Sequence, residues 1–236
     1  MTDRAPVSFG GYPQQALDFL AGLAANNNRE WFNARKKMFQ EEVQKPSQEF
    51  VAALGSRLKA ILPGIAYDTG LSGSGSVMRI YRDIRFSKDK TPYNTRLRIR
   101  FWQGPSKKAR YSGLYIRIEP GGAVVFAGQH EFDRPTLAAY RDAVVNEQLG
   151  AALEGAIDAV RNAGDYVIGG SHYKRVPHGY EKDHPRAKLL LHNGLYAYSQ
   201  SIDPAYLTRP ELVDVCFEHC KNMAPVHQWL VRLATE

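Results

Sequence analysis

The stretch from Arg79 to Tyr93, RIYRDIRFSKDKTPY, holds the residues with the greatest capacity for chemistry in this chain. Seven of its residues are Arg, Lys or Asp, and aromatic and aliphatic side chains stand between them. Arginine forks bind phosphate or carboxylate through two parallel hydrogen bonds, and lysines add point charge. The stretch therefore predicts an anion-binding site, with the candidate ligands Arg79, Arg82, Arg85, Lys88 and Lys90.

Two predicted strands, residues 96–102 and 111–118, extend this site. Successive side chains of a strand point to opposite faces, so a basic face and an apolar face alternate along RLRIRFW. The basic face adds the candidates Arg96, Arg98, Arg100 and Arg117. Aromatic side chains can stack on rings or bases, and the candidates to line the surface are Tyr81, Tyr93 and Tyr115.

The positive charge of the chain is local. Residues 79–110 hold eleven Arg or Lys and two Asp, a net charge of +9, whereas the whole chain carries +7 and the remainder therefore −2. Such a patch favours an anionic partner, either a phosphorylated small molecule or nucleic acid. No sequence signature of a nucleic-acid-binding fold accompanies it, and +7 is modest for a dedicated nucleic-acid binder.

An enzyme acting on an anionic substrate is the alternative function. Asp83 is the candidate general base and His184 the candidate general acid, with His172 and His178 as substitutes. However, an aspartate flanked by arginines has a lowered pKa and is a poor base near neutral pH. No nucleophile motif, CxxC or HExxH pattern is present, so no metal and no cofactor are predicted.

A third interpretation is structural. Arg82 could pair with Asp83 or Asp89 in an ion-pair network that fixes the turn at Pro92. Tyr93 would then pack across the turn. The apolar residues of the stretch are expected in the core: Ile80, Ile84 and Phe86.

The periodicity of apolar residues predicts the elements that hold this stretch. Helical spacing covers residues 13–25, 29–43, 46–62, 132–148, 149–163, 208–222 and 224–234. Alternation predicts strands over residues 77–82, 96–102, 111–118, 123–127, 166–175 and 195–201. The short joins between the first four strands favour an antiparallel meander, flanked by amino-terminal and carboxy-terminal helices. We expect one α+β domain spanning residues 1–236.

Bulk composition indicates the compartment. No window approaches the ~20 apolar residues of a membrane span, and the first residues lack the pattern of a signal peptide. Only two cysteines occur, Cys216 and Cys220, which fits a reducing compartment. We expect a cytoplasmic protein without a membrane partner, and the oligomeric state stays open.

The central stretch resembles the signature RxxRDxRFxx[DN]KxxY of a protein family of about this length, catalogued as a domain of unknown function. The matching positions are Arg79, Arg82, Asp83, Arg85, Phe86, Asp89, Lys90 and Tyr93. Further blocks that are similar to the family are residues 26–32, Gly128, residues 135–141 and residues 174–185. The resemblance covers the whole chain and implies no activity, substrate or cofactor.

Overall fold

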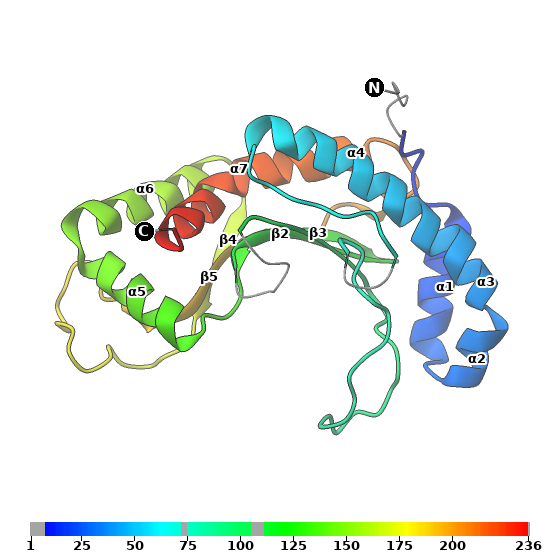
Figure 1. The fold of residues 1–236 in the computed structure, drawn as a ribbon, viewed down its shortest axis with the longest axis horizontal. Helices are drawn as coiled ribbons and strands as arrows, with labels where there is room; N and C mark the ends of the chain where they lie inside the picture. The colour runs from blue at the N-terminus through cyan, green and yellow to red at the C-terminus, as the bar shows by residue number, and fades with distance from the viewer. Residues whose placement is uncertain (1–7, 72–74, 105–110, 236) are drawn as a thin grey trace. The chain divides into compact units, whose positions relative to one another are not determined.

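The computed structural model describes residues 8–71, 75–104 and 111–235. It contains an antiparallel sheet of five strands in the order β1-β2-β3-β5-β4, with helices before and after it in the chain. The strands are β1 (Leu97–Trp102), β2 (Gly113–Glu119), β3 (Gly122–Gln129), β4 (Tyr166–Ser171) and β5 (His192–Ser199). The predicted α+β class is confirmed, and the first three strands follow the expected meander (Figure 1).

The chain divides into two compact units. Unit 1 consists of Met1–Phe101, Tyr115–Val125 and Ser201–Glu218, and unit 2 consists of Trp102–Leu114, Phe126–Gln200 and His219–Glu236. The single domain expected over residues 1–236 stays a prediction.

The amino-terminal helices of unit 1 are α1 (Gln14–Ala25), α2 (Arg29–Ala34), α3 (Lys36–Met38), the π-helix η1 (Phe39–Gln44) and α4 (Lys45–Ile61). Asn28 caps α2, because its side chain accepts a hydrogen bond from the amide of Trp31. The prediction of one regular helix over residues 29–43 is wrong: the helix is interrupted at Arg35 and then widens into η1. Pro46 follows directly and has no amide hydrogen to donate to the carbonyl four residues before it, where η1 lies.

An aromatic cluster forms part of the core of unit 1. Phe32 of α2 stacks on Tyr93 with ring centroids 4.2 Å apart, and Phe19 and Phe39 contact Phe32 on its other edges. Phe32 and Tyr93 are almost fully buried. This cluster holds the end of the stretch 79–93 against the helices.

The predicted strand at residues 77–82 does not form. This segment makes only two isolated bridges, Val77 with Ile99 and Tyr81 with Tyr93. Its backbone bonds first to β1, where the amide of Met78 donates to Arg98, and then to the returning chain, where the amide of Arg82 donates to Pro92. Because Pro92 has no amide hydrogen, the second pairing cannot continue as a ladder.

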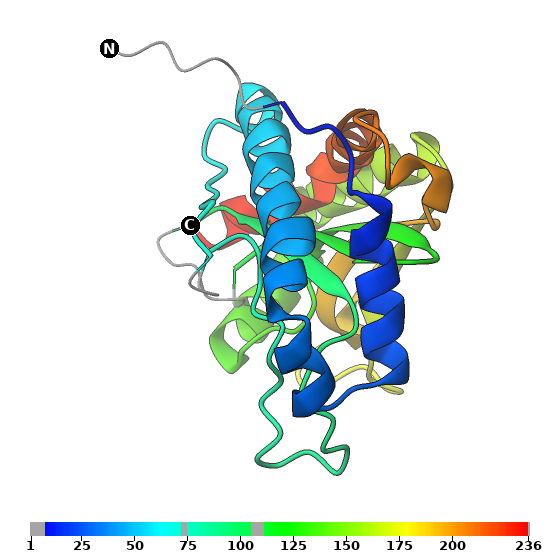
Figure 2. The same cartoon turned by 90° about the vertical axis from the view of Figure 1, so that its right-hand side faces the viewer.

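The chain between Tyr81 and Tyr93 forms a long loop. In both views it projects beyond the ends of α1 and α2 (Figures 1 and 2). We call it the signature loop.

Unit 2 contains α5 (Arg134–Val145), α6 (Glu147–Asn162), β4, β5 and the second part of α7 (Leu212–Leu233). The last two predicted helices form this one helix, which runs through Pro225. Buried residues on both sides of this proline, among them Met223 and Trp229, stabilise the continuous helix, so tertiary packing overrides the local preference.

The strand predicted over residues 166–175 ends early, at Ser171. Its pairing with β5 shifts between Gly169 and Ser171, where Gly170 has a positive φ of 115°. The loop before β5 contains a single 3-10 turn, Leu189–Leu191. In the described part of the chain, no helix has the length and apolar character that crossing a bilayer requires.

Candidate functional site

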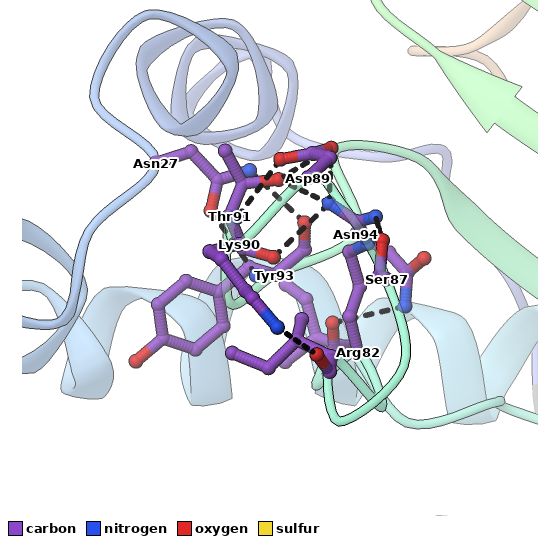
Figure 3. A network of polar contacts seen from close by, with 10 residues as sticks. Asn27, Arg82, Ser87, Asp89, Lys90, Thr91, Tyr93 and Asn94 are labelled. Atoms are coloured by element: carbon purple, nitrogen blue, oxygen red, sulfur yellow. Dashed lines mark hydrogen bonds and ion pairs between the residues drawn. The ribbon is translucent and has the colours of Figure 1, made fainter.

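Arg82 organises the signature loop from inside. Its Nη1 atom lies 2.5 Å from Asp89 Oδ2 and donates to the carbonyl of Thr91 at 3.0 Å (Figure 3). The same group donates to the Thr91 hydroxyl, and Nη2 lies 3.5 Å from Ser87 Oγ. One guanidinium therefore joins three residues of the returning chain.

Asp89 is the acceptor at the centre of this network. The Thr91 amide donates to Asp89 Oδ1 at 2.9 Å, and the Thr91 hydroxyl donates to Oδ2 at 3.0 Å. These backbone and side-chain hydrogen bonds, with that from Arg82, lower the pKa of Asp89 to about 2. The carboxylate is therefore ionised throughout the neutral range.

Asn27 ties the loop to the turn between α1 and α2. Its side-chain amide donates to the carbonyl of Tyr93 at 2.9 Å, and its Oδ1 accepts from the Tyr93 amide at 3.1 Å (Figure 3). The Asn27 side chain thus binds both backbone polar groups of Tyr93, as a neighbouring strand would. Lys90 Nζ donates to the carbonyl of Ile84 at 3.0 Å, which fastens the outer part of the loop to itself.

Asp83 pairs with Arg85 and not with Arg82. Arg85 Nη2 lies 2.7 Å from Asp83 Oδ2, and Arg85 Nε donates to Oδ1 at 3.0 Å. These hydrogen bonds lower the pKa of Asp83 to about 2, with a smaller contribution from the charge of Arg79. Asp89 is thus the partner of Arg82, and Asp83 is too weakly basic to take a proton at neutral pH.

The prediction that Phe86 belongs to the core is wrong. Its side chain is 95% exposed at the signature loop, where Arg85 lies 5.8 Å from the ring centroid. The loop projects beyond the ends of α1 and α2, so much of it lies away from the buried core of unit 1. Ile80 and Ile84 are half-buried.

A recess of about 530 Å³ lies where the loop meets strands β1 and β2. We call it the arginine recess. Its lining residues are Asn27, Arg82, Asp89, Thr91, Tyr93, Asn94, Thr95, Arg96, Arg98 and Arg117. Four predicted anion ligands therefore meet in one concave site, surrounded by hydroxyl and amide groups.

Positive charge exceeds negative charge in the arginine recess. Arg82 binds Asp89, whereas Arg96 and Arg117 share one carboxylate, Glu119, at 2.7 and 3.8 Å. Three of the four lining arginines thus contact these two carboxylates, and four arginines against two carboxylates leave a surplus of two positive charges.

Arg98 is the arginine of the recess whose charged form is disfavoured by its surroundings. Burial lowers its pKa, and the neighbouring charge of Arg79 lowers it further. Within residues 8–71, 75–104 and 111–235, neither the Arg98 nor the Arg79 side chain makes a hydrogen bond or an ion pair. The positive charges of Arg79 and Arg98 are therefore close enough to affect each other, and Arg79 also acts on the carboxylate of Asp83.

The other predicted ligands lie elsewhere. Arg100 is 8% exposed, and its charge and hydrogen bond partly offset the rise that burial causes in the pKa of Tyr115. Arg79 and Tyr81 line a neighbouring cavity. Arg85, Lys88 and Lys90 lie on the outer part of the signature loop. Lys107, Lys108 and Arg110, which contribute to the local charge, lie outside the described residues.

His184 belongs to unit 2, whereas Asp83 belongs to unit 1. The Nδ1 atom of His184 accepts a hydrogen bond from the amide of Arg186 at 3.0 Å, so His184 helps to shape the loop before β5. His172 and His178 are exposed. The described residues contain no cluster of three or more His, Cys, Asp or Glu that could hold a metal ion.

Sequence reasoning missed Asn27, Asn94 and Glu119. Asn27 lies in residues 26–32, one of the blocks that resemble the family, but the resemblance assigns it no contact. Glu119 sits at the end of β2, and its role depends on the register of β2 beside β1. No pattern in the sequence identifies either contact.

The protein family described as a conserved hypothetical protein, DUF2461, matches residues 15–229. No curated protein and no solved structure matches the chain significantly. The family match includes the signature loop and both strands that line the arginine recess. The resemblance to a family of unknown function is thus confirmed: the chain belongs to the DUF2461 family of conserved hypothetical proteins.

Proposed function

We propose that the protein binds a phosphorylated small molecule in the arginine recess. The observation that carries this proposal is Arg98, which lines the recess, makes no side-chain hydrogen bond or ion pair with a described residue, and is close enough to the charge of Arg79 to be affected by it. Bringing like charges together and partly burying one of them costs free energy, and a bound anion would offset that cost. Phosphate accepts hydrogen bonds from guanidinium forks in pairs.

The shape of the recess favours a small ligand. Its volume of about 530 Å³ falls in the range of small-molecule sites. Hydroxyl and amide groups of Thr91, Asn94 and Thr95 line it and could orient a phosphate ester. Nucleic acid shares the phosphate chemistry, and it is the outcome that the experiment must distinguish.

Catalysis on the ligand is not part of the proposal. Asp83 is ionised and bound to Arg85, and Asp89 is occupied by Arg82 and Thr91. Neither carboxylate is placed to accept a proton from a substrate at neutral pH. Binding is therefore the function that the geometry supports best, in a cytoplasmic protein as the low cysteine content suggests.

The test is calorimetric titration of the full chain at low salt with methyl phosphate and with a single-stranded oligonucleotide. We expect methyl phosphate to bind, and Arg98→Ala to weaken binding about tenfold or more, because a charge-assisted hydrogen bond is lost. Arg85→Ala is the matched control, since it removes the same charge from the signature loop outside the recess.

Three results would contradict the proposal. Methyl phosphate could fail to bind, or Arg85→Ala could weaken binding as much as Arg98→Ala. The oligonucleotide could also bind far more tightly than methyl phosphate and lose that affinity steeply with salt, which would make nucleic acid the partner. Melting temperatures of both variants show whether each one is folded.

A further inference from the structure

We propose that the ligand of the arginine recess is a phosphate ester with an apolar group about the size of one ring, and that this group occupies a cavity beside the recess. The inference rests on the proposed function and names the class of ligand. It depends on three observations in unit 1: the cavity itself, the arginines that it shares with the recess, and the apolar residues at its rim.

The cavity lies among α1, the π-helix η1 and the start of β1. Its volume is about 130 Å³. The aliphatic, methionine and phenylalanine side chains that line it are Leu20, Phe39, Val43, Leu71, Val77, Met78, Ile80 and Leu97. An apolar protein cavity of about 150 Å³ binds benzene, so this one matches a single ring or a short branched chain.

The cavity and the arginine recess have a common wall. Arg96 lines both of them, and Arg79, which lines the cavity, lies close enough to Arg98 in the recess to lower its pKa. Arginine side chains can cover apolar surface with their aliphatic stems while the guanidinium groups bind an anion. A ligand with a phosphate at these arginines therefore has an apolar site within reach of its ester group.

Two large side chains at the rim of the cavity, one aliphatic and one aromatic, are partly exposed. Leu71 is 38% exposed and Tyr81 is 50% exposed, and both line the cavity. A second hollow of about 350 Å³ shares Leu71, Tyr81, Phe39 and Gln44 with it and is therefore adjacent. Gln44 ends the π-helix η1, and such wide turns within helices are frequent at functional sites.

The experiment compares three probes on the full chain: methyl phosphate, phenyl phosphate and phenol. We expect phenyl phosphate to bind about tenfold more tightly than methyl phosphate, because burial of the ring adds apolar contact. Phenol should bind much more weakly than phenyl phosphate. Phenol binding as tight as phenyl phosphate binding would overturn the inference, because the cavity would then act without the arginines.

Two variants place a larger side chain at residues that line the cavity, Leu71→Trp and Met78→Trp. Each should remove the advantage of phenyl phosphate and leave methyl phosphate binding unchanged. Met38→Trp is the matched control, because Met38 is 41% exposed in α3 and does not line the cavity. It should keep the tenfold advantage of the parent protein.

The outcomes separate the two proposals. If methyl and phenyl phosphate bind equally and Arg98→Ala weakens both, the proposed function stands and the apolar cavity is not part of the site. If the advantage of phenyl phosphate persists in both filled variants, the ring binds elsewhere and the inference is wrong. If neither ester binds the parent protein, the proposed function and this inference fail together.

Discussion

Arg82 closes the signature loop by joining residues that are five to nine positions further along the chain. Its contacts with Asp89, Thr91 and Ser87 lie within the loop, and its side chain is 25% exposed. A lysine could replace its charge, but it lacks the planar fork that reaches several acceptors at once. The shape of the loop therefore depends on this guanidinium.

We predict that Arg82→Ala and Arg82→Lys each lower the melting temperature by about 2–4 °C, because several hydrogen bonds are lost. Arg85→Ala should leave the melting temperature nearly unchanged, since Arg85 is 77% exposed and binds a residue two positions away. Thermal unfolding followed by circular dichroism measures all three. Equal effects of the Arg82 and Arg85 variants would show that the network does not hold the loop.

Acid should weaken the same network. The folded-state pKa of Asp89 is about 2, below the ordinary value of 3.8 for this side chain. Its contribution to stability is therefore complete above pH 3.8 and is lost as the pH falls toward 2. The difference in stability between the parent protein and Asp89→Asn should shrink over that interval.

The residue types of the site were predictable from the sequence, but their contacts were not. Arginine and lysine at positions 79–100 are enough to indicate anion binding. In contrast, Phe86 was assigned to the core from its apolar side chain alone and is fully exposed. Whether an apolar side chain is buried depends on what packs over it, and the projecting loop provides nothing there.

Elements with a strong period were predicted well, and those with competing partners were not. Strands β1, β2 and β3 lie close to the predicted residues, because their alternation is regular and their joins are short. Residues 77–82 alternate too, yet they divide their hydrogen bonds between β1 and the returning loop. Such a change of partner follows from tertiary structure and is not visible in a local pattern.

Helix α7 contains the most deeply buried histidine of unit 2. His227 is fully buried, and its Nδ1 atom lies 2.7 Å from Ser112 Oγ, with Nε2 3.3 Å from Gln103 Oε1. Ser112 donates to the unprotonated nitrogen if the proton sits on the nitrogen that faces Gln103. Burial lowers the pKa of His227 to about 4, so the neutral ring is the form that the folded protein holds.

We therefore predict that stability falls as the pH is lowered from about 6.5 to about 4, because unfolded His227 takes up a proton before folded His227 does. His227→Gln should be less stable at pH 7 and should lose less stability across this interval. His192 and His219, whose pKa values burial also lowers, are the controls: His192→Gln and His219→Gln should keep most of the dependence. Urea unfolding at several pH values measures the free energy of unfolding. If this free energy depended on pH in His227→Gln as it does in the parent protein, His227 would not be the residue responsible.

At the scale of the whole molecule, local charge matters more than net charge. The chain carries +7, but the arginine recess concentrates four arginines on one side of unit 1. Net charge attracts any anion weakly and is screened over about 10 Å at moderate salt, whereas paired hydrogen bonds in a recess are screened less. The affinity of a ligand that binds in the recess should therefore depend on which charged residue is replaced.

Two variants separate these effects, since Arg98→Ala and Lys37→Ala each reduce the net charge from +7 to +6. Lys37 is 85% exposed in α3 and lies outside the recess. We predict that Lys37→Ala leaves methyl phosphate binding within about twofold of the parent protein at 0.1 M salt, because exposed charges are screened there. Arg98→Ala should retain its large loss of affinity at that salt concentration. Equal losses in the two variants, both disappearing with added salt, would mean that the protein attracts phosphate only through its overall positive charge.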